Sequence, residues 1–217
     1  MTSTRSRGSA LTALVWVGTW FLILVVVVFV VIRVASDVGH IRAGEVPPEG
    51  DFDRRYVLNP WIAYLHIVPG AVYLLGAPFQ LTKRIRRGHI RFHRRLGRVL
   101  IAAGLVTAVF AIVVGVVMPF GDVAESSATI VFGIYFMTAL VLAYRAISSL
   151  DVLTHRRWMI RAFAIGLGVG MIRIVIGVGE VFGVGIEQSF GAAFWIAFAM
   201  LSFCAEIWLR LRPDLPV

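Results

Sequence analysis

Six long apolar segments restrict what this chain can fold into. A helix needs about 20 predominantly apolar residues to cross a ~30 Å hydrocarbon core. Only 15% of the residues are charged, against about 25% in soluble domains, and the mean hydropathy is +0.86. The sequence therefore predicts an all-α fold, a polytopic membrane bundle that forms one integral domain over residues 1–217. Its six predicted transmembrane helices cover residues 11–33, 61–82, 96–118, 127–150, 158–181 and 191–209.

The distribution of basic residues predicts the orientation of these spans. Loops on the cytoplasmic side of a membrane carry an excess of Lys and Arg. If the N-terminus is cytoplasmic, sixteen basic residues lie on the inner side, and only Arg33, Arg42, Arg54 and Arg55 lie on the outer side. We therefore expect the N- and C-termini to be cytoplasmic.

The net charge of +9 does not indicate a nucleic-acid partner. A nucleic-acid-binding domain spreads its basic residues over a wettable surface, whereas here they form short runs between apolar segments. The longest run, Lys83–Arg98, has the composition of a patch that contacts the anionic head groups of membrane lipids.

One connection is long, and it covers residues 34–60. It contains Pro47 and Pro48 and shows no apolar period of its own. We expect it to lie over the outer mouth of the bundle or to be partly disordered. Because the other connections are short, consecutive helices should be antiparallel neighbours.

A weak internal repeat links the third and fifth spans. The segment HRRLGRVLIAAGL begins at His93, and HRRWMIRAFAIGLG begins at His155. Each continues with a further arginine, Arg98 or Arg161. The repeat predicts two related hairpins, made of spans two and three and of spans four and five, which form a four-helix core. The alternative is that His-Arg-Arg is a positively charged interface anchor that occurs twice.

Small and ionisable residues share the same faces of the predicted helices. Small residues mark helix–helix contacts in membranes, and charged groups at membrane depth are candidates for function. We therefore expect Arg173, with Glu180 as its counter-charge and His66 facing both, to form a polar pocket in the outer half. Alternatively, Arg173 and Glu180 neutralise one another and only hold two helices together. The two stripes are His66, Gly70, Tyr73, Ala77, Gln80 and Arg84 in span two, and Gly166, Gly170, Arg173, Gly177 and Glu180 in span five.

Histidines at the start of two spans point to a cofactor. His93 and His155 begin spans three and five at matching depth, as two ligands of a haem iron would. Ordinary head-group contacts by these histidines are the alternative. A quinone held by His66, Tyr73, Gln80 or Arg84 is a further possibility. No GxSxG, HExxH or Walker sequence is present, so the sequence gives no sign of a hydrolase.

The motifs around these residues resemble a known family. HIVPGAVYLLGAPFQL around His66, then HRRLGRVL, then HRRWMIRAFA with the later Arg173 are similar to an uncharacterised family of predicted bacterial membrane proteins, domain of unknown function 2306. The resemblance covers residues 61–175. It implies a multi-pass protein of the bacterial plasma membrane and brings no activity with it. The positions it implicates are His66, Gln80, His93, His155, Arg161 and Arg173.

These observations lead to a functional hypothesis with two alternatives. The first is a membrane protein that binds a small ligand, of a redox type with haem b or a quinone. The second is an accessory subunit or scaffold of a larger membrane complex. The third is a small-molecule or proton transporter, with Arg173 and Glu180 on the path. A bound cofactor, a stoichiometric partner or two accessibility states would distinguish them.

Overall fold

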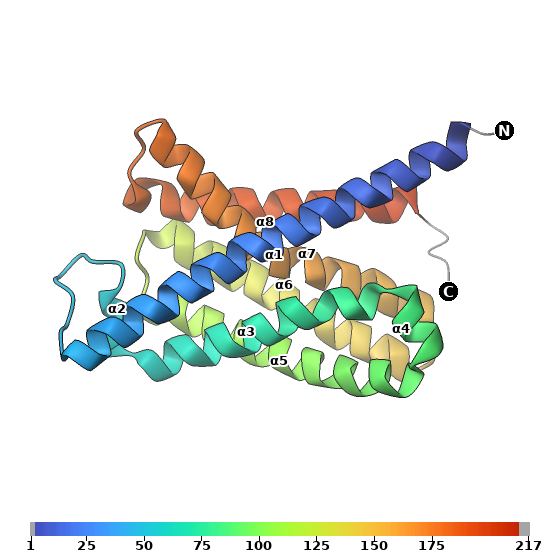
Figure 1. The fold of residues 1–217 in the computed structure, drawn as a ribbon, viewed down its shortest axis with the longest axis horizontal. Coiled ribbons are helices and arrows are strands. Elements are labelled where there is room, and N and C mark those ends of the chain that lie inside the picture. Colours follow the sequence, from blue (N-terminus) through green and yellow to red (C-terminus); the bar gives the residue numbers. More distant parts are fainter. Residues whose placement is uncertain (1–2, 213–217) are drawn as a thin grey trace.

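The computed structural model describes residues 3–212, which form eight helices joined by short connections (Figure 1). Residues 1–2 and 213–217, and with them both chain termini predicted to be cytoplasmic, lie outside the described residues. Each long helix contains a stretch apolar enough to cross a membrane, which confirms the all-α, six-span prediction. The long helices are α1 (Ser3–Ala43), α3 (Pro60–Leu81), α5 (Ile90–Val117), α6 (Val123–Ser148), α7 (Val152–Val181) and α8 (Ile186–Leu211), and the short ones are α2 (Arg54–Leu58) and α4 (Lys83–Gly88).

Four helices form a closed ring around the core of the bundle. Helix α3 packs on α5, α5 on α6, α6 on α7, and α7 back on α3. Within the described part of the chain, the backbones of the diagonal pairs α3–α6 and α5–α7 do not approach each other closely. This arrangement is the four-helix core predicted for spans two to five, and side chains from opposite helices therefore meet only in its interior.

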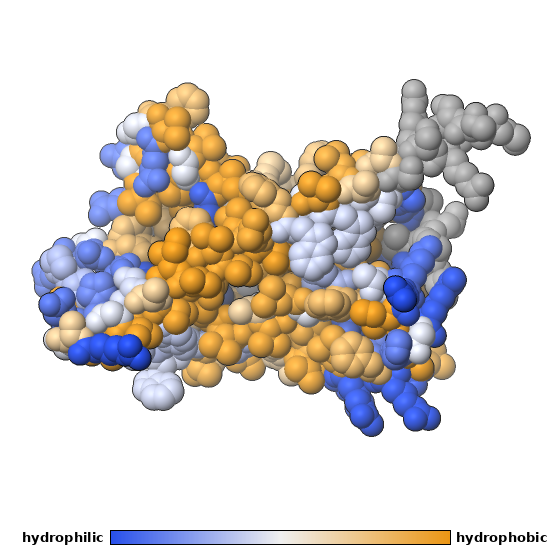
Figure 2. Space-filling model, viewed as in Figure 1, coloured by the Kyte–Doolittle hydropathy of each residue, from blue (hydrophilic) through white to orange (hydrophobic). Residues whose placement is uncertain are grey.

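Helices α1 and α8 pack on the outside of this ring. Helix α8 lies against α7 and α6, while α1 crosses α7 and α3 (Figure 1). The crossing of α1 is close, because a Cβ placed on Gly170 of α7 would lie 2.6 Å from the carbonyl oxygen of Leu22. Much of the rest of α1 is exposed and apolar, as at Leu14 and Val17. Such a surface suits lipid, and Figure 2 shows an apolar band between two polar ends.

The prediction that residues 34–60 form a loop is wrong for two parts of that segment. Helix α1 continues to Ala43, and α2 covers Arg54–Leu58, so within this segment only residues 44–53 and Asn59 are irregular. The extension of α1 is stabilised by an ion pair between Arg33 and Asp37, 2.7 Å apart and one turn from each other. It ends at Gly44, whose positive φ of 67° is the left-handed conformation that commonly terminates helices.

The two ends of the bundle differ in character. The end that carries α4 and the starts of α5 and α7 is rich in arginine, and we call it the basic end. The opposite end contains residues 44–53, the α5–α6 connection and the α7–α8 connection, and we call it the loop end. In Figure 1 the basic end lies on the right and the loop end on the left.

Candidate functional site

A column of polar side chains runs through the interior of the four-helix core. Tyr73 of α3 forms the end of this column nearer the loop end, with 2% of its surface exposed. Cβ atoms placed on Gly104 of α5 and Gly166 of α7 would lie 3.2 and 3.1 Å from the Tyr73 ring. The same ring packs edge-on against Phe136 of α6, with 5.2 Å between the centroids. Tyr73 therefore contacts all three other helices of the core.

The contacts of Tyr73 fix the depth of two histidines. His93 precedes Gly104 by eleven residues, and His155 precedes Gly166 by the same number. Eleven residues make three turns of helix and about 16 Å, so each histidine shares a face with its glycine. His93 and His155 consequently lie at matching depth on two diagonal helices, on the faces that look into the core. They are close enough to interact electrostatically.

Hydrogen bonding leaves one nitrogen of His155 available. Its Nδ1 lies 2.9 Å from the carbonyl oxygen of Ala143 in α6. Because a carbonyl only accepts, Nδ1 carries the proton and donates it, so Nε2 keeps a free lone pair. This is the arrangement that metal-bound histidines usually show.

Three polar atoms of the column are buried without a hydrogen-bond partner. They are the hydroxyl of Tyr73, Nε2 of Gln80 and Nδ1 of His93. Gln80 lies level with Gly97, one turn beyond His93, because a Cβ on Gly97 would meet its Oε1 at 3.4 Å. Buried polar atoms in proteins are nearly always paired. Three unpaired ones in a single column therefore indicate a place for a polar ligand.

Arginines surround the column at the basic end. Arg86 and Arg94 interact electrostatically with His93, and Arg156 interacts with His155 and with Arg86. A ligand with anionic groups would be attracted to this end of the column.

His66 and Arg161, two other predicted site residues, serve contacts between helices. His66 of α3 places Nδ1 2.9 Å from the carbonyl oxygen of Thr107 in α5 and accepts on its own carbonyl from the Thr107 hydroxyl at 2.6 Å. Arg161 of α7 forms two hydrogen bonds, of 2.6 and 3.0 Å, with Glu206 of α8. Its guanidinium also lies 4.7 Å from the Trp158 ring centroid.

A second group of charged residues lies at the loop end. The guanidinium carbons of Arg33, Arg55 and Arg173 lie 5.8, 4.4 and 5.8 Å from the ring centroid of Phe52. We call these three residues the arginine cluster. They come from α1, α2 and α7, so residues distant in sequence meet around one ring. Phe52 itself is anchored by edge-on contacts with Phe120 and Phe190.

The predicted pairing of Arg173 with Glu180 does not form. Glu180 is exposed, and it makes no ion pair with Arg173 among the described residues. Arg33 instead forms the buried pair that sequence reasoning missed, with Asp37 and with Asp53 at 2.6 Å. The i, i+4 spacing of Arg33 and Asp37 is a usable signal, but Arg33 ends the predicted first span and Asp37 falls in the segment predicted to be a loop.

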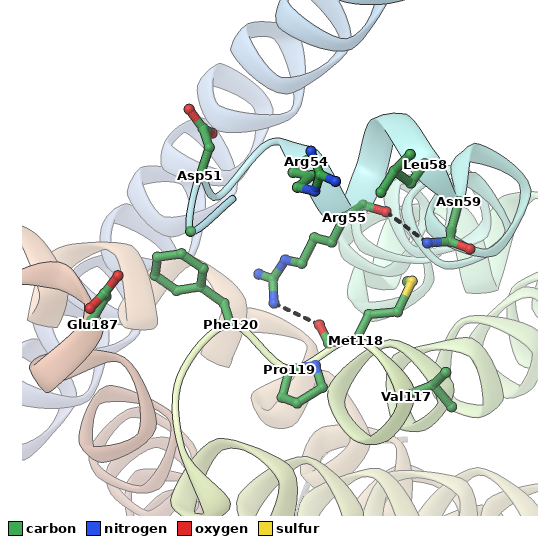
Figure 3. Close-up of a pocket in the computed structure, with 11 residues that line it drawn as sticks. Asp51, Arg54, Arg55, Leu58, Asn59, Val117, Met118, Pro119, Phe120 and Glu187 are labelled. Carbon is green, nitrogen blue, oxygen red and sulfur yellow. Dashed lines mark hydrogen bonds between the residues drawn. The ribbon is translucent and has the colours of Figure 1, made fainter. Parts of the chain in front are cut away.

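A shallow pocket of about 350 Å³ opens at the loop end beside the arginine cluster. Figure 3 shows the Arg55 side chain directed toward Met118, whose carbonyl oxygen it binds at 3.0 Å. Asp51, Phe120 and Glu187 lie on other sides of the same pocket. The pocket therefore exposes part of the charged network to the loop end.

The contact between Arg33 and Asp53 predicts a pH dependence. The hydrogen bond from Arg33 lowers the pKa of Asp53 below its usual value. A carboxyl whose pKa is lower in the folded state stabilises the fold above the unfolded pKa of about 4, and this stabilisation disappears as the pH falls through the folded value. Wild type should therefore exceed Asp53→Asn in stability by up to about 1 kcal/mol at pH 7. Melting curves between pH 7 and pH 3 should show the difference closing below about pH 4, and a difference independent of pH would contradict this role.

Fold and site together define a class of protein, a six-span membrane bundle with a polar column inside a four-helix core. The family model described as "Predicted membrane protein (DUF2306)" matches residues 63–209. The chain therefore belongs to this family, as the motifs around His66, His93 and His155 indicated. Comparison with curated proteins and with solved structures gave no match.

Proposed function

We propose that this protein is a membrane-embedded electron carrier that binds haem b between His93 and His155. The observation that carries the proposal is the placement of these two histidines at one depth on diagonal helices of a four-helix core. The imidazoles of His93 and His155 would hold the haem iron, one from each of these two helices.

The donor set fits a haem iron. Imidazole nitrogen is a good ligand for iron, and the Nδ1 of His155 is already engaged by Ala143. Among the described residues, no group of three or more His, Cys, Asp or Glu side chains could hold a metal ion. A haem iron, which the porphyrin already binds, would need only these two histidines from the protein. Bound there, haem would supply one-electron transfer.

The other residues of the column have roles that follow from their positions. Arg86, Arg94 and Arg156 would hold the anionic carboxylates of the porphyrin at the basic end. Tyr73 closes the column toward the loop end and offers a hydroxyl that donates to a ligand. The ring of α3, α5, α6 and α7 excludes lipid and water from the interior.

Two buried donors favour a quinone as a second candidate. The Tyr73 hydroxyl and the Gln80 amide lack partners, and both could donate to a quinone carbonyl. The same preparation tests this candidate, because a quinone extracted with organic solvent from purified protein should decrease when Tyr73→Phe and Gln80→Leu are combined.

We infer that the basic end faces the cytoplasm of a bacterial plasma membrane. The excess of arginine at this end supports the inference. The run Lys83–Arg98 would then contact anionic head groups of the inner leaflet.

The haem proposal is tested by visible spectroscopy of protein expressed with ample haem. A dithionite-reduced minus oxidised spectrum should show a b-type band, and a pyridine haemochrome assay should give about one haem per chain. His93→Ala and His155→Ala should each abolish the band, because either change removes an axial ligand. His66→Ala is the matched control and should retain it, since His66 contacts Thr107 of α5.

Two results would overturn the proposal. One is a featureless spectrum from folded wild-type protein. The other is a haem band that survives both His93→Ala and His155→Ala. Size-exclusion chromatography and circular dichroism of each variant show whether it has folded.

A further inference from the structure

Arg173 is a half-buried arginine of α7 that forms no ion pair among the described residues. It lies on α7, eight residues before the helix ends at Val181, which corresponds to about 12 Å from the loop end of the helix. The described residues give it no ion pair and no hydrogen bond. Its recorded neighbours are the rings of Phe29 and Phe52, whose centroids lie 5.2 and 5.8 Å from its guanidinium carbon.

The carboxylates nearby are already engaged. Asp37 and Asp53 both bind Arg33. Glu125 accepts hydrogen bonds from the backbone of Phe120 and Gly121 at 2.9 and 2.7 Å and lies 3.6 Å from Arg55.

The charged groups that act on Arg173 are arginines. Electrostatic interactions reach it from Arg33 and Arg55, both of like charge, and from the phenol of Tyr56. Because Asp37, Asp53 and Glu125 offset the charges of Arg33 and Arg55, Arg173 has no carboxylate of its own among the described residues.

A guanidinium without a carboxylate of its own is able to bind an anion. Arginine does not lose its proton in proteins, so Arg173 stays charged at a depth where charge is costly. We propose that the arginine cluster is a binding site for an anionic group, a carboxylate or a phosphate, held chiefly by Arg173. The planar fork of a guanidinium matches both groups with two parallel hydrogen bonds. This site is separate from the polar column and does not depend on haem.

The position of Arg173 is compatible with two sources of such a group. A small solute could reach it from the loop end, where Arg55 of the cluster lines the open pocket. A lipid head group could reach it along α1, because Phe29 beside Arg173 is exposed on the lipid-facing helix.

Thermal unfolding with two probes tests the site and separates the sources. Delipidated protein in detergent is titrated with inorganic phosphate in a phosphate-free buffer, and protein in nanodiscs is compared between phosphatidylcholine alone and phosphatidylcholine with phosphatidylglycerol. We expect at least one anion to raise the melting temperature of wild type. Arg173→Gln should weaken the apparent affinity about tenfold to a hundredfold, the range for charge-assisted hydrogen bonds. A response to phosphate indicates a solute, and a response to phosphatidylglycerol alone indicates a head group.

Two further variants make the test decisive. Arg145→Gln removes an exposed arginine from α6 and should respond as wild type does. Arg173→Lys keeps the charge but loses the planar fork, so it should bind more weakly than wild type and more tightly than Arg173→Gln. If Arg173→Gln does not fold, Arg173→Lys still tests the role of the Arg173 guanidinium. The proposal is wrong if neither anion stabilises wild type, or if the Arg173 variants respond as strongly as wild type.

Discussion

Replacing Arg33 by leucine is expected to lower the free energy of unfolding by about 3–5 kcal/mol, the usual cost of removing one member of a buried ion pair. The change leaves Asp37 fully buried with only the Tyr64 hydroxyl, at 3.2 Å, as a hydrogen-bond donor. It also releases Asp53, and with it the segment that carries Phe52 into the bundle. Reversible unfolding in mixed detergent micelles measures the loss.

The double variant Arg33→Leu/Asp37→Leu identifies the cause. Because it leaves no charge buried on α1, it should be more stable than the single variant by at least 1–2 kcal/mol, even though it has lost more polar contacts. If the double variant is as unstable as Arg33→Leu, the unpaired charge of Asp37 is not the source of the loss, which then comes from the other contacts of Arg33, with Asp53 and with the Tyr56 ring.

Hydropathy and the repeat were sufficient to predict the core of the fold. An apolar segment of about 20 residues that crosses a membrane has few possible structures other than a helix. The number and positions of the spans therefore follow from composition. The two His-Arg-Arg segments each begin a helix, and helical geometry converts equal spacing into equal depth. For this reason the positions of His93 and His155 could be predicted without knowledge of side-chain contacts.

The loop end could not be predicted in the same way. Where α1 leaves the hydrocarbon core, a helix and a loop can have the same polar composition, so the extension of α1 to Ala43 carried no hydropathy signal. The return of Phe52 into the bundle depends on Phe120 and Phe190, which are far away in sequence.

Shared helical faces also proved insufficient to identify ion pairs. Arg173 and Glu180 lie on one stripe, but two turns separate them, and Glu180 reaches the surface. Arg161 of α7 forms its ion pair with Glu206 of another helix, α8. A stripe shows which side of a helix carries polar groups, whereas pairing depends on the rotation and depth of the neighbouring helix.

The start of α8 lies close to the N-terminal cap of α6 at the loop end, and this contact leads to the second large prediction. A Cβ on Gly191 would lie 2.8 Å from the Cβ of Ala124 and 2.9 Å from the backbone nitrogen of Glu125, and it would also overlap the carboxylate of Asp122. Asp122 caps the N-terminus of α6 by accepting from the backbone nitrogens of Ala124 and Glu125. These are mainly backbone and cap atoms, which cannot move aside as the end of a flexible side chain would.

Gly191→Ala should therefore cost about 2–4 kcal/mol, the sum of overpacking and a weakened helix cap. Gly177→Ala is the matched control, because a Cβ at that position of α7 meets nothing within 4 Å, and it should be neutral or stabilising by up to about 1 kcal/mol. Unfolding of the two variants under the same conditions gives the difference. Equal stabilities would mean that α8 can shift at its start without cost. A large loss confined to Gly191→Ala would mean that this contact holds α8 against the α6 cap, and through Glu125 it would hold Arg55 in place.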